Sequence, residues 1–435
     1  MAFNTQRLKK AYYAFSSIFK RQPAFGTSLA DADLDSRHNC TVTFEDVVER
    51  DTIYDCGEED VFDEETTAQL KRIRLSYASI TPQRLFGWIC MLLSAVAAPT
   101  GTPANKVVTV TINATGGTFT ITVTLEGLTF TTSALAWNAS AATVQSALEA
   151  CDWLAGNITV GLATLVYTLT FVNDLAKTNL PVVTTTPGAL TGGTSTAAVA
   201  VTTPGANKFH AATRSTDDAL AKTSIGCGYE GNTVDPEKFY NCVVESIVIT
   251  LNRRKVVTVE VVLLGRFTPS DMDSFDVPDC ENLPALKGAE CLVKVDGEFL
   301  REEFWNATIT LNNQVPTGDD AFPFSGTEVA TLERGDKPTY PISMQVLGSE
   351  GDAVHTLCKD GTKAPIEFLL GLPGNRASLI FPNVLLKFAS NPKVYVGELR
   401  RSAIAIDANP HKDATLGTPL KAEGYLDQTS AFLTT

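Results

Sequence analysis

Apolar and polar residues alternate along much of this chain, and a period of two is the pattern of β-strands. Valine, isoleucine and threonine are frequent in the alternating segments, which favours strands further. The segments predicted as strands are residues 41–55, 71–79, 107–113, 118–125, 165–172, 243–251, 256–264, 305–311 and 341–347. Two segments have a helical pattern instead. One is residues 83–97 after Thr81-Pro82. The other follows Asn138, which we predict as its N-cap, and has Ala141, Val144, Ala147 and Leu148 on one face. We therefore predict a mainly β protein of sandwich or barrel type with short flanking helices.

Composition changes abruptly in the middle of the chain. The 107 residues from Thr100 to Ala206 contain 26 threonines and six charged residues, whereas the other 328 of the 435 residues contain 78 charged residues. Turn signals mark both edges, at Pro99 to Pro103 and at Pro204-Gly205. We predict an inserted β-rich domain at 101–205, with one helix and a hairpin across Gly116-Gly117. Its end, 184–204, is either a strand pair or a loose linker.

A weak internal repeat lies outside the insertion. The segment Ile247-Val-Ile-Thr-Leu-Asn252 is similar to Thr308-Ile-Thr-Leu-Asn312, and the strands that follow them end in Val-Leu-Leu-Gly265 and Gln-Val-Leu-Gly348. The spacing is too long for a solenoid. The repeat predicts a duplicated β-domain, with the first copy at 1–100 and 206–270 and the second at 271–435.

Charge and cysteine content argue against several classes of function and of structural site. The chain has 49 acidic and 35 basic residues, a net charge of −14, which argues against binding nucleic acid by neutralising phosphates. Its nine cysteines include no C-x-x-C pair, so we expect reduced, mostly buried thiols without a zinc site or a disulfide framework. The longest largely apolar run, 85–98, is shorter than the roughly 20 residues of a membrane span, and no signal peptide is expected.

Motifs of catalysis are either absent or out of context. Gly226-Cys-Gly228-Tyr-Glu-Gly231 fits G-x-G-x-x-G, but no helix is predicted after it, so we predict a loop and not a nucleotide site. The acidic stretch 45–65 has eleven carboxylates against Arg50, which is typical of a solvated face or a flexible arm. We predict no catalytic residue, no metal ligand and no cofactor, and we expect that the chain is not an enzyme.

The polar faces of the predicted strands bear on function more directly than these motifs do. Each of four strands outside the insertion has one apolar face and one face of small, weakly charged polar residues. Such a face is found on an ordinary sandwich strand facing water, and also on a strand that lines an aqueous channel past which a polyanion can slide. The candidate lumen-lining residues are Ser246, Thr250, Thr258, Glu260, Thr308, Thr310, Asn312, Ser343 and Gln345.

Several segments outside the insertion form a recognisable set. They are Phe25-Gly-Thr-Ser-Leu29, Ile73-Arg-Leu-Ser-Tyr77 with the helix after it, 240–254, Ser378-Leu-Ile-Phe-Pro-Asn-Val384 and 398–406. In these segments the chain resembles the major tail tube proteins of long-tailed, siphovirus-like bacteriophages, including a subgroup in which the tube fold is duplicated within one chain. The resemblance covers roughly the 328 residues outside the insertion and includes a Phe-Pro-Asn-Val turn before a closing strand. The insertion resembles a small domain of phage structural and bacterial surface proteins, through residues 116–121 and 138–148.

The resemblance implies a virion protein, made in the cytoplasm of a bacterial host, that polymerises with itself into stacked rings and forms a conduit for genome ejection. A ring would need three chains if the fold is duplicated and six if it is not. The implied partners are the tape measure, tail terminator and baseplate or tip proteins, with DNA crossing the lumen unbound and the insertion outside. Segments 1–35 and 45–65 and the tail after Asn409 are candidates for contacts between rings. The alternatives are a surface adhesin that binds glycan through the threonine-rich insertion and, more remotely, a hydrolase using an Asp/Glu pair.

Overall fold

We describe the protein from a computed structural model. The described residues are 12–16, 21, 30, 36–37, 40–54, 61–215, 220–229, 237–266, 270–271, 285–301, 303–317, 332–335, 337–348, 353–389, 402–427 and 431–433. Most of the segment 1–35 therefore lies outside the described residues. Within the described part, no helix is long and apolar enough to cross a membrane.

The chain forms a mainly β body and a smaller β-rich lobe made by the insertion, and this confirms the predicted fold class. The elements before the lobe are β1 (Tyr12–Ser16), β2 (Ser36–Arg37), β3 (Thr41–Tyr54), β4 (Val61–Tyr77), α1 (Pro82–Leu93) and β5 (Ser94–Val96). The lobe contains β6 (Val107–Asn113), β7 (Thr118–Leu125), β8 (Leu128–Thr131), β9 (Leu135–Ala136), α2 (Ala141–Glu149), β10 (Ile158–Ala163), β11 (Val166–Phe171), the 3-10 helix η2 (Asn173–Leu175), β12 (Val182–Thr186) and β13 (Thr196–Thr203).

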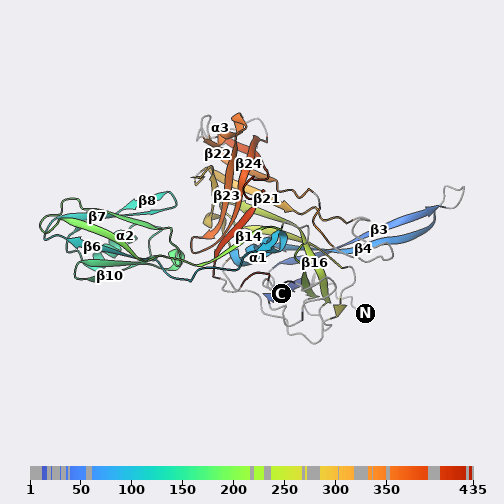
Figure 1. The fold of residues 1–435 in the computed structure, drawn as a ribbon, viewed down its shortest axis with the longest axis horizontal. Coiled ribbons are helices and arrows are strands. Elements are labelled where there is room, and N and C mark those ends of the chain that lie inside the picture. The colour runs from blue at the N-terminus through green and yellow to red at the C-terminus, as the bar shows by residue number, and fades with distance from the viewer. Residues whose placement is uncertain are drawn as a thin grey trace, which may run out of the picture.

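The body resumes with β14 (Lys208–Arg214), β15 (Thr223–Tyr229), β16 (Glu237–Asn252), β17 (Thr258–Arg266), β18 (Ser270–Asp271), the 3-10 helix η3 (Gly288–Glu290), β19 (Cys291–Val295), β20 (Glu298–Phe299) and β21 (Phe304–Asn312). It ends with β22 (Ile342–Gly348), α3 (Ala353–Asp360), β23 (Lys363–Leu372), β24 (Asn375–Phe388), β25 (Ser402–Pro410) and β26 (Lys421–Leu426). Figure 1 shows the lobe extending to one side of the body and the hairpin of β3 and β4 extending to the other.

Eight antiparallel strands of the body lie in one continuous row. Their order is β3, β4, β17, β16, β21, β22, β25 and the C-terminal part of β24. The two strands with similar sequences, β16 and β21, are direct neighbours at the centre of this row, with Ile249 opposite Ile309. The strands that follow each of them, β17 and β22, flank this central pair.

One hydrophobic cluster holds the body together. Alternate residues of β16, β17, β21 and β22 point into it and are buried, as the period of two requires, and α1 packs on the same cluster. The cluster spans residues on both sides of the predicted boundary at 270/271. Thr81 caps α1 by accepting a hydrogen bond from the Arg84 amide, with Pro82 in the first turn. The helix ends at Ser94, whose φ of 70° is left-handed, so it is shorter than the 83–97 predicted.

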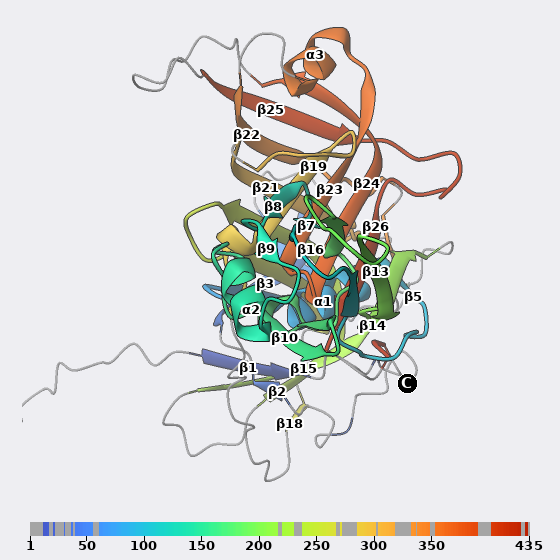
Figure 2. The ribbon, with the colours of Figure 1, turned by 90° about the vertical axis from the view of Figure 1, so that its left-hand side faces the viewer.

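The lobe is a sandwich with its own core. One sheet has the order β10-β11-β6-β13, and the other contains β12, β7 and β8, with β9 beside β7. Every residue of its hydrophobic cluster lies between Val108 and Val199. In Figure 2 the lobe faces the viewer, in front of the central part of the body, while β22, β25 and α3 lie above it.

Three local predictions for the lobe are corrected by the structure. β6 and β7 have the predicted bounds, but they belong to different sheets and do not form a hairpin. The chain crosses between the sheets at Gly117, whose φ is +86° and where a Cβ would lie 1.9 Å from the Ala189 carbonyl oxygen. The cap of α2 is Ser140, which accepts a hydrogen bond from the Thr143 amide, and not Asn138. The end of the lobe forms two strands, β12 and β13, in opposite sheets.

Two further predictions for the body are wrong in detail, and a third is narrowed. Of the two alternatives for the acidic stretch 45–65, a solvated face or a flexible arm, the described residues exclude the flexible arm, because β3 and β4 pair from Thr41 to Tyr54. Phe381-Pro-Asn-Val384 is not a turn; it lies inside β24, where the register with β23 shifts at a bulge that accommodates the proline. The predicted loop at 226–229 is part of β15, which pairs with β1 and β16.

The tail after Asn409 is also part of the body. β26 pairs with β14 on one side and with β24 on the other, so its described residues are a built-in strand and not a separate arm. Ala422 and Leu426 on this strand are fully buried in the body cluster.

Candidate functional site

All nine residues predicted to line a lumen lie on one face of the row of strands. Directly opposed residues of an antiparallel pair share a face, so the register identifies the face without reference to side-chain contacts. We call this face the polar strip. It consists of Ser246 and Thr250 of β16, Thr258 and Glu260 of β17, Thr308, Thr310 and Asn312 of β21, and Ser343 and Gln345 of β22.

The strip is continuous across the strands. One line of opposed residues runs from Thr258 through Thr250 and Thr308 to Ser343. It ends on β25 at Asp407, which is opposite both Ser343 and Lys387 of β24. A parallel line passes from Ser76 of β4 through Glu260 and Val248 to Thr310, and another from Arg74 through Val262 and Ser246 to Asn312. Small polar side chains therefore cover a surface that four separate sequence segments build.

Exposure distinguishes the two faces of these strands. Thr250, Thr258, Ser343 and Gln345 are exposed, and the other five members of the strip are half-buried. On the opposite face, Ile249, Ile309 and Met344 are at most 1% exposed. Val262 departs from the pattern, because it lies on the polar face and is nevertheless buried. The register of β16 and β17 shifts beside it, between Val244 and Ser246.

The one charged residue of the strip, Glu260, is paired. Arg74 donates a hydrogen bond to the Glu260 carboxylate, with 2.5 Å between Nη1 and Oε1. Asn306 donates to Gln345, with 2.9 Å between Nδ2 and Oε1. Sequence reasoning missed Arg74, Ser76, Asn306 and Asp407, which share this face. The alternation on 71–79 was a signal for the first two, but the pairing of β4 with β17 is non-local and has no sequence motif.

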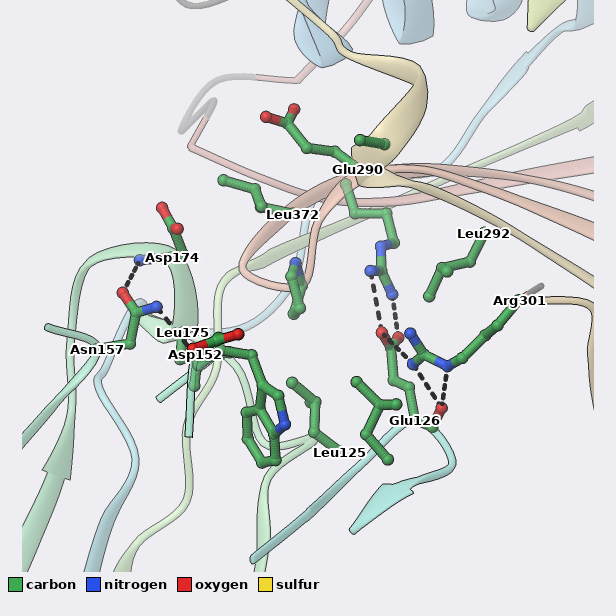
Figure 3. Close-up of a pocket in the computed structure, with 15 residues that line it drawn as sticks. Leu125, Glu126, Asp152, Asn157, Asp174, Leu175, Glu290, Leu292, Arg301 and Leu372 are labelled. Carbon is green, nitrogen blue, oxygen red and sulfur yellow. Dashed lines mark hydrogen bonds and ion pairs between the residues drawn. The ribbon is translucent and has the colours of Figure 1, made fainter. Parts of the chain in front are cut away.

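A second candidate site lies where the lobe contacts the body (Figure 3). Glu126, in the turn between β7 and β8, points from the lobe toward Arg301 of the body in Figure 3, and it also binds Arg376. Arg376 binds the Glu126 carboxylate through two nitrogens, and both side chains are only 7% exposed. Arg301 donates to the Glu126 main-chain carbonyl from Nε at 3.0 Å and from Nη2 at 2.5 Å. This bidentate pair fixes the lobe against the second half of the chain.

Further polar contacts extend this junction. The Lys177 ammonium lies 2.5 Å from the Asp427 carboxylate, and Asn207 donates to the Gly374 carbonyl at 2.6 Å and to Asp427 at 3.1 Å. Gly374 approaches the lobe so closely that a Cβ there would lie 1.9 Å from the Ala176 carbonyl oxygen. One signal in the sequence pointed to the junction: charged residues are rare in the insertion, and Glu126 and Lys177 are two of its six.

A shallow pocket of about 270 Å³ opens beside the Glu126 contact. Leu125, Leu372 and Trp153 contribute its apolar lining, and Asp152 and Asp174 contribute carboxylates. Asn157 uses both of its polar atoms locally, since its Oδ1 accepts from the Asp174 amide and its Nδ2 donates to the Trp153 carbonyl. The pocket has a mixed lining, and the arginines beside it are already bound to Glu126.

Most of the described cysteines are buried thiols. Seven are free, and all of them except the half-buried Cys40 are buried; Cys56 and Cys280 lie outside the described residues. Burial raises the pKa of Cys242 and of Cys291 to about 12 and that of Cys358 to about 11. Because the thiolate is the nucleophile, these three side chains are poorly suited to covalent catalysis at neutral pH.

Comparison with known proteins adds no relative to this description. No protein-family model matches the chain, and no curated protein matches it significantly.

Proposed function

We propose that the chain is a structural subunit of a phage tail tube, which polymerises as stacked rings into a hollow conduit for DNA ejection. The observation that carries the proposal is the polar strip: small, uncharged or paired side chains on a face that continues across the central strands of an antiparallel row. A wall of this kind offers no basic cluster to hold phosphate, so a DNA duplex can slide past it.

The edge of the row supports assembly. In the described part of the chain, β3 is paired along one side only, by β4. An open strand of 14 residues is a template for pairing with another chain. In a subunit built to polymerise, such an edge extends the sheet into the next subunit.

The width of the row favours three chains in a ring. Eight strands at a spacing of about 4.8 Å span roughly 38 Å, so three chains give a backbone circle about 37 Å across and six chains one about 73 Å across. Side chains project into the circle from every strand. The smaller circle leaves room for about one DNA duplex, whereas the larger one would leave several times that width.

The insertion is compatible with a place outside the conduit. It contacts the body through Glu126 and Lys177, and their partners Arg301, Arg376 and Asp427 do not belong to the polar strip. The strip therefore stays uncovered by the lobe. Burial raises the pKa of Cys242 and of Cys291 to about 12, which argues against these two thiols as nucleophiles.

Negative-stain electron microscopy of the purified protein, with mass photometry over a range of concentrations, tests this proposal. We expect rings or tubes with a central channel and a mass per ring of three chains. Six chains per ring would keep the function and contradict the ring-size argument. A protein that stays monomeric at every concentration would contradict the proposal and make glycan binding by residues 101–205 the function to test next.

A further inference from the structure

The lobe has one long edge strand, β13, that is left largely uncovered in the described structure. The edge strands of its two sheets are β10 and β13 in one sheet and β12 and β8 in the other. The edge of β10 is covered by α2, where Gln145 accepts a hydrogen bond from the Val160 amide at 3.2 Å. β8 is only four residues long, and a short edge strand is a poor template for pairing. β12 contacts β13 near the turn that joins them, where the Thr185 hydroxyl donates to the Ala197 carbonyl at 2.6 Å, but β13 continues to Thr203.

The pairing of β13 with β6 determines which of its backbone groups face outward. Successive residues of a strand direct their amide and carbonyl groups to opposite sides. The Ile112 amide donates to the Leu165 carbonyl on the β11 side, so even-numbered residues of β6 face β11 and odd-numbered ones face β13. The residues of β13 opposite these odd-numbered residues are 196, 198 and 200, and they bond to β6.

The outward residues of β13 are therefore Ala197, Val199 and Val201. The Ala197 carbonyl accepts the hydrogen bond from Thr185, which agrees with this assignment. In the described structure β13 pairs with β6 alone, so no strand bonds to Val199 and Val201 on the outward side. The register stays regular up to Val201, and the bulge lies after it. Two residues with free backbone groups thus face outward on a regular stretch of strand.

The side chains at this edge do not block pairing with another strand. Natural edge strands are commonly protected by charged residues or proline, whereas β13 has the sequence Thr196-Ala-Ala-Val-Ala-Val-Thr-Thr203. No charged residue occurs between Lys177 and Lys208. Val201 of β13 and Val182 of β12 are 53% and 52% exposed, the highest values among the large apolar side chains of the described structure. The edge is therefore uncharged and partly apolar.

Charge favours a second copy of the same strand as the partner of this edge. Two chains that each carry a net charge of −14 repel one another, so copies approach most easily where their surfaces are uncharged. Residues 100–206 carry two basic and four acidic residues, a net charge of −2, against −12 for the rest of the chain. Within that region, β13 lies in the stretch without any charge. Its valines are also of the β-branched type that stabilises cross-strand pairs.

We infer that β13 of one free chain pairs antiparallel with β13 of a second copy, around a twofold axis at Ala200. In this register Val199 of each copy is opposite Val201 of the other, and each such pair exchanges two hydrogen bonds through its outward backbone groups. A register centred on Val199 would instead use Ala197, whose carbonyl is already bonded to Thr185. The pairing joins two four-stranded sheets of two lobes into one continuous sheet.

The inference goes beyond the proposed function. A twofold contact is self-complementary and closes after two copies. Rings that stack in one direction relate their chains by rotation about the tube axis and translation along it, so such a twofold axis does not occur within one tube. The pair is therefore a form of the free subunit, present before assembly.

A cysteine at the axis tests the pairing in the full-length chain, at concentrations below those at which rings form. Residue 200 of each copy lies in a non-hydrogen-bonded pair, with about 4.5 Å between the two Cα atoms, a separation that a disulfide can span. We expect Ala200→Cys, treated with oxidised glutathione, to give a covalent dimer that peptide mass spectrometry shows to be linked at residue 200. Thr159→Cys, at an exposed position on the covered edge strand β10, is the matched control and should give none. Wild type treated in the same way reports any linkage through the native cysteines.

Charges at the same position test the register. Ala200→Glu and Ala200→Lys each place two like charges opposite one another, so each variant alone should dimerise roughly fivefold more weakly than wild type in sedimentation velocity. Ala200 is exposed, so folding should be unaffected. An equimolar mixture restores dimerisation, because a carboxylate of one copy then meets an ammonium of the other. Thr159→Glu and Thr159→Lys, alone or mixed, should dimerise like wild type.

The pairing and the proposed function can fail independently. Absence of a link at residue 200, or a mixture that dimerises as weakly as its components, would overturn the self-pairing and leave the edge to a strand of another protein. Rings or tubes of the wild-type chain without that link would support the function alone. The link without rings or tubes at any higher concentration would support the pairing alone.

Discussion

The body and the lobe bury their β-sheets in different ways. The lobe closes two small sheets on each other around a core that uses only its own residues. The body instead lays eight strands in one row, covers one face with a hydrophobic cluster and leaves the other face polar. It also leaves β3 open along one side in its described part. Closing two sheets completes the core of the lobe, whereas an open strand at the edge of a row would gain backbone hydrogen bonds from a further strand.

The largest loss of stability should come from a cavity-creating substitution in either of the two cores. Phe171→Ala in the lobe and Ile309→Ala in the body each remove a side chain that is 0% exposed. Each should lower the free energy of unfolding of its own region by about 3–5 kcal/mol. Differential scanning calorimetry should show two transitions, one shifted by each substitution. A single transition that both substitutions shift equally would mean that lobe and body unfold as one unit.

A smaller effect is expected at the junction between the regions. Glu126→Gln keeps the shape of the side chain but leaves Arg376, which is 6% exposed, without its carboxylate partner. Loss of one member of a buried ion pair is strongly destabilising, and we expect a cost of about 2–3 kcal/mol because glutamine still accepts hydrogen bonds. Small-angle scattering should then report a broader distribution of lobe positions. Glu298→Gln, at an exposed position on the body, is the control and should change neither quantity.

Removal of the lobe sharpens the comparison further. The chain enters and leaves the lobe side by side, since Thr100 pairs with Phe209 and Ala104 with Ala206. A deletion of 101–205 that joins these ends should therefore leave the body folded. Its free energy of unfolding should change by no more than about 2 kcal/mol, less than for Glu126→Gln, because without the lobe Arg376 is exposed to water and is not buried without a partner. Circular dichroism and electron microscopy would measure folding and tube formation. Loss of tubes from a well-folded deletion would place the lobe in the tube wall.

Sequence reasoning was accurate where local pattern decides the structure. The alternation in 107–113 and 118–125 gave the bounds of β6 and β7 correctly, and the period of two assigned the faces of β16, β17, β21 and β22, because burial of one face enforces that period. It failed where pairing between segments that are far apart in the sequence determines the structure. The Gly116-Gly117 signal fits a hairpin, but the pairing of β6 with β11 and β13 separates the two strands. Charge alone left a solvated face and a flexible arm both open at 45–65, and the pairing of β3 with β4 excludes the arm in the described residues.

The smallest effect on folding, and the sharpest test of the polar strip, is expected for Thr258→Lys. Thr258 is exposed on β17, opposite Thr250, so a lysine there should change the free energy of unfolding by about 0.5 kcal/mol or less. Glu260→Lys would test the strip less specifically, because it also breaks the ion pair with Arg74 and places two cations side by side.

In a tube, each Thr258→Lys chain adds a cation to the proposed lumen at every ring. Attraction to phosphate should then slow genome ejection, measured as DNA release from virions. The same substitution at Thr159, an exposed position on the lobe, adds an equal charge outside the proposed lumen and should leave ejection unchanged. Ejection at the wild-type rate from well-assembled Thr258→Lys tails would show that the strip faces the outside of the tube, and the body would then resemble the lobe in presenting its polar residues only to solvent.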